Sequence, residues 1–152
     1  MKTKILLPAI AIGTLLIMAL YFLINPSYER SLAAKYYYEI GEYKEAYSLA
    51  KEAFSMDVYN RMASTVMVQS QNSLRYVKYN DMAKKYMQDI DEIALHKDIS
   101  DADKAKIRLI CGIMIDSYIK LAPSVITDKD LVTESADYHQ KFEKLLEKVN
   151  LY

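Results

Sequence analysis

Residues 5–24, ILLPAIAIGTLLIMALYFLI, organise the rest of the chain, because they form a run of twenty positions without a charge. At about 1.5 Å per residue, a helix of this length covers the roughly 30 Å hydrocarbon core of a bilayer. We therefore predict a signal-anchor transmembrane helix over residues 1–25 and a tethered domain over 26–152. The positions that mark the predicted span are its ends, its proline, its glycine and its aromatic pair: Ile5, Pro8, Gly13, Tyr21, Phe22 and Ile24.

A cleaved signal peptide is the alternative interpretation, since Lys2 and Lys4 form a basic segment before the apolar run. The apolar region of a signal peptide has about 7 to 15 residues and is followed by small residues at the cleavage site. This run is longer and ends in four bulky residues, 21–24, which favours an uncleaved anchor. Cationic residues beside a span stay in the cytoplasm, so the tethered domain is predicted to lie on the other side of the membrane.

The composition limits the chemistry of the tethered domain. The chain has 20 Lys and Arg against 20 Asp and Glu, and two of the lysines precede the span, so the domain carries a net charge of about −2. Such a domain lacks the basic surface that nucleic-acid binding requires. The one cysteine, Cys111, lies among apolar residues, which indicates a buried thiol. Only 3 Gly and 3 Pro in 152 residues, with abundant helix formers, predict an all-α fold.

Apolar residues recur three and four positions apart through most of the domain, which is the period of amphipathic helices. We expect about six antiparallel helices after the anchor, joined by short connections. Their expected ranges are Ser27, as the cap, to Gly41; Tyr43 to about 56; 58–74; about 79–96; Ser100, in a capping box with Asp103, to Ala122; and a last helix after the loop 123–127. In the first of them the expected inward stripe is Tyr28, Leu32, Tyr36, Tyr37 and Ile40.

The stretch 34–53, AKYYYEIGEYKEAYSLAKEA, places small and aromatic residues around a turn. The small positions are Ala34, Ala46 and Ala53, the aromatic one is Tyr37, and the turn is Gly41-x-Tyr43. In these positions the chain resembles the tetratricopeptide (TPR) family, whose paired helices approach closely at small residues. A second, partial match lies 36 residues further on, at Tyr79-x-x-Met82-Ala83. The resemblance covers about 27–96 and implies TPR-like hairpins.

The resemblance also implies a binding face, because in TPR-like stacks the first helix of each pair lines a groove for a partner segment. On this chain that register gives five partner-binding residues: Lys35, Tyr38, Met67, Gln71 and Leu74. Tyr36, Tyr37 and Tyr38 are consecutive and point about 100° apart on a helix, so at least one is exposed. Two interpretations of Tyr38 stay open: an aromatic ring that covers a helix edge while Tyr36 and Tyr37 pack inside, or an anchor for the partner.

Motifs for catalysis or metal binding are missing from the sequence. Neither His96 nor His139 has a second ligand at a recognised metal spacing, so both are interpreted as solvated histidines. The sequence has no Gly-rich phosphate loop, nucleophile elbow or paired-carboxylate motif. We therefore predict a protein that is not an enzyme and has no cofactor, metal or small-molecule substrate.

These observations predict a single-pass protein of the bacterial inner membrane whose TPR-like domain lies in the periplasm and binds other proteins of the cell envelope. The resemblance implies a scaffold or accessory subunit of an envelope machine, such as a flagellar motor or a secretion apparatus. A periplasmic chaperone-like factor that holds clients near a translocon is one alternative. An organelle-membrane receptor with the opposite topology and an anchored enzyme with a site between helices are the others.

Overall fold

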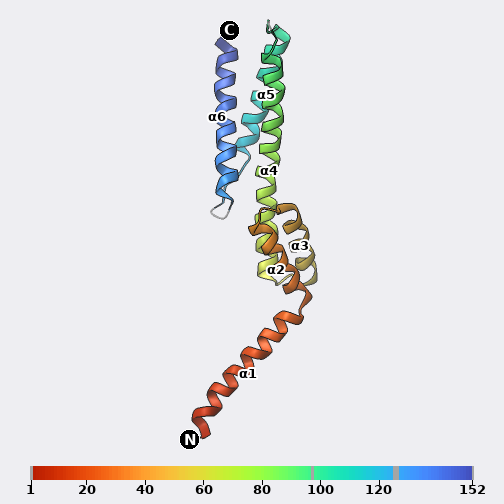
Figure 1. Cartoon of the computed structure of the whole chain (residues 1–152), viewed down its shortest axis with the longest axis vertical. Helices are drawn as coiled ribbons and strands as arrows, with labels where there is room; N and C mark the ends of the chain where they lie inside the picture. The colour runs from red at the N-terminus through yellow and green to blue at the C-terminus, as the bar shows by residue number, and fades with distance from the viewer. Residues whose placement is uncertain (1, 97, 125–126, 152) are drawn as a thin grey trace. The chain divides into compact units, whose positions relative to one another are not determined.

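A computed structural model of the chain is built from α-helices alone in the residues that it describes, 2–96, 98–124 and 127–151 (Figure 1). Side chains are described from residue 7 onward, apart from those of 22 and 23. The helices are α1 (Lys2–Ile24), α2 (Pro26–Glu39), α3 (Tyr43–Met56), α4 (Arg61–Ala94), α5 (Asp101–Ile119) and α6 (Lys129–Leu151). The all-α prediction is confirmed. The chain divides into two compact units, Met1–Gln71 and Asn72–Tyr152, so the boundary between them falls within α4.

Local signals at the helix ends agree with the sequence at two places and differ at a third. Gly41 has a φ of 85°, a left-handed conformation that favours glycine, and it follows the end of α2 as predicted. Ser100 and Asp103 form the predicted capping box of α5. The cap of α2, however, is Asn25, whose side-chain oxygen accepts the Ser27 backbone N–H at 3.0 Å. The prediction that Ser27 caps this helix was wrong, because its hydroxyl is used elsewhere.

The third and fourth predicted helices are one continuous helix, α4. The prediction of a break near residues 74–79 was wrong, and among the described residues five helices rather than six follow α1. The polar run 69–73 interrupts the apolar stripe without interrupting the helix, since it has no glycine or proline. Two of its residues, Ser70 and Ser73, are fully buried, so the run marks close packing rather than a loop. The second hairpin implied by the repeat register is therefore not formed.

In the first unit, α2 and α3 are antiparallel and the first turns of α4 pack with them. Their core consists of Ala34, Ala46, Ala50 and Val66, with Tyr37, Tyr38, Leu49, Met62 and Met67 packed against it. The buried face of α2 is made of small residues, Ser27, Ser31 and Ala34. The predicted inward stripe of this helix was wrong at three positions, because Leu32, Tyr36 and Ile40 are 62%, 62% and 53% exposed. Small residues face inward because they let α2 and α3 approach closely.

In the second unit, the part of α4 from Asn72 onward packs with α5 and α6 around one apolar core. Its buried members come from all three helices: Tyr79, Ala83, Ile90, Ile93, Ile107, Ile110, Cys111, Met114 and Phe142. The stripe that the helical period predicts for α5, Ile107, Ile110, Cys111, Met114, Tyr118 and Leu121, is confirmed, and so is the burial of the Cys111 thiol. Burial raises the pKa of this thiol, which keeps it protonated and unreactive.

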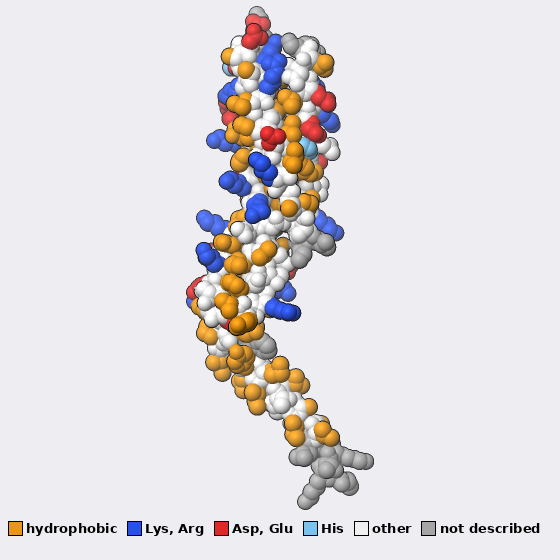
Figure 2. All heavy atoms as spheres, turned by 180° about the vertical axis from the view of Figure 1, so that it is seen from behind, with side chains coloured by type: hydrophobic (Ala, Val, Ile, Leu, Met, Phe, Trp, Pro, Cys, Tyr) orange, Lys and Arg blue, Asp and Glu red, His pale blue; other side chains and the backbone are white. Residues whose placement is uncertain are grey.

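The described side chains of α1 are apolar or uncharged and lie largely exposed, as Figure 2 shows for one face of the chain. Leu7 is 75% exposed and Ile17 is 69% exposed. Among the described residues, no helix by itself has the length and apolar character needed to cross a bilayer. The segments Leu7–Tyr21 and Pro26–Glu39, bent by 75° at the break between them, meet that criterion only as a pair.

Candidate interaction surfaces

The five residues predicted to bind a partner do not form one exposed patch. Tyr38 and Met67 are half-buried and both pack against the core of the first unit. Lys35 and Gln71 are exposed, on α2 and α4 respectively. Leu74 is half-buried and belongs to the second unit. Within the first unit, the charged and amide groups are thus available to solvent, while the two apolar members contribute to packing.

The three consecutive tyrosines have different surroundings from those expected. Tyr36 is 62% exposed, whereas Tyr37 and Tyr38 are both half-buried against the same core. The Tyr38 ring also packs edge-on against the buried Tyr43 of α3, with ring centroids 5.5 Å apart. The expectation that Tyr36 packs inside was wrong, because the buried face of α2 lies on the side of Ser27, Ser31 and Ala34.

Asn60, a buried asparagine that no sequence pattern indicated, links helices of the first unit. Its side chain is fully buried directly before α4, where its Oδ1 accepts the Ala63 backbone N–H at 3.1 Å. Its Nδ2 lies 2.9 Å from Ser27 Oγ and 3.2 Å from Ser31 Oγ. Ser27 Oγ in turn donates to the Ala53 carbonyl at 2.9 Å. The Asn60 side chain therefore caps α4 and links it to α2. Ser27 of α2 is in turn hydrogen-bonded to the last turn of α3.

A second asparagine, Asn80, plays a comparable part in the second unit. Its Nδ2 donates to Glu134 Oε2 at 2.9 Å, and its Oδ1 accepts from Ser135 Oγ at 2.6 Å. Asn72 donates to Thr127 Oγ1 at 2.8 Å, two turns earlier in α4. Along α4, these contacts first reach Thr127, just before α6, and then Glu134 and Ser135 within α6, so the two helices are parallel within this unit. Buried amides of this kind fix register, because shifting the helices would leave them without partners.

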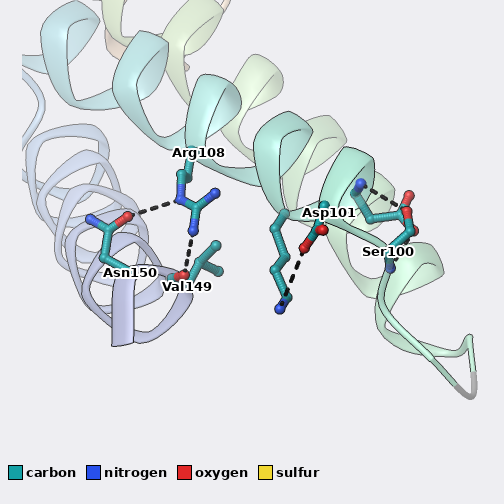
Figure 3. Close-up of polar contacts among 7 residues, drawn as sticks. Ser100, Asp101, Arg108, Val149 and Asn150 are labelled. Atoms are coloured by element: carbon teal, nitrogen blue, oxygen red, sulfur yellow. Dashed lines mark hydrogen bonds and ion pairs between the residues drawn. The ribbon is translucent and has the colours of Figure 1, made fainter. Parts of the chain in front are cut away.

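Helices α5 and α6 pack antiparallel to each other. Arg108 joins α5 to the last turn of α6, at the end of the pair that lies away from the loop connecting them (Figure 3). Its Nε donates to Asn150 Oδ1 at 3.0 Å and its Nη2 donates to the Val149 carbonyl at 2.9 Å. That carbonyl lies in the last turn of α6, where helix carbonyls lack intrahelical partners and a cation is favourable. The same two helices line an open groove of about 520 Å³. Its apolar lining residues are Ile115 of α5 and Leu146 of α6.

An uncovered, largely apolar surface of the second unit lies on α5, opposite its buried stripe. We call it the α5 outer face, and its residues are Ala102, Ala105, Leu109, Gly112 and Ile113. Leu109 is 65% exposed and Ile113 is 40% exposed. A Cβ placed on Gly112 would meet no atom within 4 Å, so the space beside it is open. Large side chains alternating with small ones are the relief that another helix packs against.

Aromatic and polar groups meet inside the second unit at Tyr79, Tyr118 and His139. The Tyr118 ring stacks on the His139 ring with centroids 4.1 Å apart and lies 5.8 Å from the Tyr79 ring. His139 Nε2 is 3.4 Å from Glu143 Oε1, and its Nδ1 is buried without a hydrogen-bond partner. The interpretation of His139 as solvated was therefore wrong, while His96 is exposed as expected. Burial, with the neighbouring Tyr118, raises the pKa of the Tyr79 hydroxyl well above its usual range.

Within the described ranges, no group of three or more His, Cys, Asp or Glu side chains is placed to hold a metal ion. Comparison with known proteins gives no further assignment, since no family model, curated protein or solved structure matches the chain.

Proposed function

We propose that this chain is a membrane-anchored interaction subunit of the bacterial cell envelope, with α1 in the inner membrane and the helical units in the periplasm. The proposed partner is an amphipathic helix of another envelope protein, which packs on the α5 outer face. The α2–α3 hairpin, with Ala34 and Ala46 buried at its contact, supports a TPR-like interpretation of the first pair of helices. A scaffold or accessory role in a motor or secretion machine is the proposal that this architecture favours.

The observation that carries the proposal is the exposure of Leu109 and Ile113 one turn apart on one face of α5. Full burial of an exposed large aliphatic side chain is worth about 1.5 to 3 kcal/mol, and covering the exposed parts of Leu109 and Ile113 supplies a share of that to a partner helix. Residues at this spacing lie on the same side of a helix, and helix-in-groove recognition uses this pattern. The uncharged run at residues 5–24 supports the anchor.

In-cell crosslinking of the full chain tests the partner surface. A photoreactive amino acid at Ile113 is expected to give one crosslinked species in the membrane fraction, and the same group at exposed Asp137 of α6 is expected to give none. Leu109→Glu should abolish that species. Lys106→Glu is the matched control, because it introduces the same group at an exposed position of α5 beside the outer face. Equal crosslinking at both sites, or loss with both glutamates, would contradict the proposed surface.

The anchor and its orientation are tested separately. The chain should stay in the membrane pellet after alkaline carbonate extraction, and its mature amino terminus should be at or near Met1. A reporter that is active only outside the cytoplasm should be active when fused after Tyr152. A mature terminus near Ser27 would show a cleaved signal peptide, and an inactive reporter would reverse the topology.

A further inference from the structure

The connection between α3 and α4 exposes large apolar side chains in a short segment. We call Met56, Val58 and Tyr59 the α3–α4 tip, and they are 48%, 60% and 88% exposed. The core of their own unit leaves these parts of the side chains uncovered. Their exposure is therefore unfavourable in water unless another apolar or amphipathic phase covers them.

The shape of the tip is fixed by hydrogen bonds. Asp57 Oδ1 accepts the Tyr59 backbone N–H at 2.9 Å, and the Asp57 backbone carbonyl accepts the Asn60 N–H at 3.1 Å. The Asp57 N–H in turn donates to the Ala53 carbonyl at 3.1 Å, which continues the ladder of α3. This Asx turn fixes the backbone that carries Val58 and Tyr59, so little backbone entropy is lost when their side chains are covered.

The tip lies at the end of the first unit where α1 joins it, as Figure 1 shows. Hydrogen bonds from Ser27 to the Ala53 carbonyl and from Asn60 to Ser27 flank the tip on both sides. Ser27 is the second residue of α2, three positions after Ile24, where α1 ends. These contacts thus hold the tip at the end of the unit where α2 begins after α1.

We propose that the α3–α4 tip rests in the headgroup region of the bilayer that holds α1, and that it forms a second membrane contact beside the anchor. This inference rests on the proposed membrane anchor. Because α1 ends where the bilayer ends, a tip fixed beside that end is at the level of the headgroups. Tyrosine is favoured at that level, as its ring is apolar and its hydroxyl is polar. The exposed Arg61, which follows the tip, is suited to lipid phosphates.

A single-tryptophan experiment tests this contact, since the chain has no Trp of its own. Full chains with Tyr59→Trp or Ile40→Trp are reconstituted separately into phosphatidylcholine vesicles, some containing lipids brominated near the headgroup. Ile40 is the matched control, being an exposed apolar residue at the α2–α3 turn, the other end of the unit. The Tyr59→Trp chain should show blue-shifted emission and lose intensity with brominated lipid, whereas the Ile40→Trp chain should show neither change. Adding Val58→Asp to the Tyr59→Trp chain should reduce the quenching.

The outcomes separate this inference from the proposed anchor. If the chains float with the vesicles but brominated lipid quenches neither, the anchor holds and the tip contact is refuted. If brominated lipid quenches both chains equally, the unit lies on the membrane without using the tip, which also refutes the contact. If the chains do not float, the anchor itself fails and the inference fails with it.

Discussion

Replacing Asn60 should destabilise the first unit more than any other single exchange of a polar side chain there. Its fully buried amide caps α4 through the Ala63 N–H and donates toward Ser27 and Ser31 of α2. The two hydroxyls keep acceptors without it, because Ser27 donates to the Ala53 carbonyl and Ser31 to the Tyr28 carbonyl. The loss is therefore confined to the bonds that Asn60 itself makes.

The magnitude follows from those bonds. An N-cap contributes about 1 kcal/mol to the free energy of unfolding. The amide has two N–H donors, so at most two full hydrogen bonds to α2 are counted, at a net of about 1 kcal/mol each. Asn60→Ala is thus expected to lower the free energy of unfolding by about 3 kcal/mol, and Asn60→Ser, which keeps a capping oxygen, by about 2 kcal/mol.

Urea unfolding of the full chain in detergent micelles, followed by far-ultraviolet circular dichroism, measures both changes. Gln71→Ala serves as the control, because Gln71 is exposed on the same helix and its loss should change stability by less than about 0.5 kcal/mol. If Asn60→Ala behaves like this control, the buried amide does not hold α2 and α4 together. If the serine and alanine variants lose equal stability, the cap contributes nothing.

Tyr79→Phe should leave stability at pH 7 unchanged or raise it by up to about 1 kcal/mol, since the buried hydroxyl has no partner. Burial raises the Tyr79 pKa, so as pH rises above about 10 this tyrosine ionises more readily in the unfolded chain than in the folded one, and the stability of the native chain should fall. Melting temperatures measured at pH 7 and pH 11 should therefore differ less for Tyr79→Phe than for the native chain. Ala46→Arg should cost several kcal/mol, enough to abolish the cooperative melt, because Ala46 is fully buried; an unchanged melting temperature would contradict the hairpin packing. Tyr38→Ala should lower the melting temperature clearly, while Tyr36→Ala should hardly change it; the reverse order would place the buried face of α2 wrongly.

Sequence patterns predicted the second unit better than the first, and the reason is physical. The inward residues of α5, such as Ile107, Ile110 and Met114, are large and apolar, so they produce a clear period. The capping box at Ser100 and the left-handed turn at Gly41 are local signals that need no tertiary information. Where side-chain size and local chemistry determine the structure, the sequence is sufficient.

The first unit follows a rule that hydrophobic periodicity does not detect. Helix α2 buries Ser27, Ser31 and Ala34, and these small residues are inside because Asn60 and the backbone of α3 satisfy the hydroxyls there. A period of apolar residues therefore selects the opposite face, with Leu32 and Tyr36. For the same reason α4 was predicted as two helices, because a run that contains serines is typical of a loop when only the sequence is considered.

The burial of small residues and the exposure of large ones also change which residues are candidates for binding a partner. Tyr38 and Met67 were chosen for their position in a repeat register, yet both pack against the core of the first unit. Two of the large apolar residues that packing leaves uncovered, Leu109 on α5 and Tyr59 at the α3–α4 tip, were not singled out by the repeat register. An exposed aliphatic or aromatic side chain is unfavourable in water, so it identifies a contact surface more directly than its place in a repeat. Leu109 and Tyr59 belong to different units and are proposed to contact different phases, a partner helix and a lipid surface. Substitutions at the two positions should accordingly separate partner recovery from lipid quenching, and a variant at either position that altered both would mean that one surface serves both contacts.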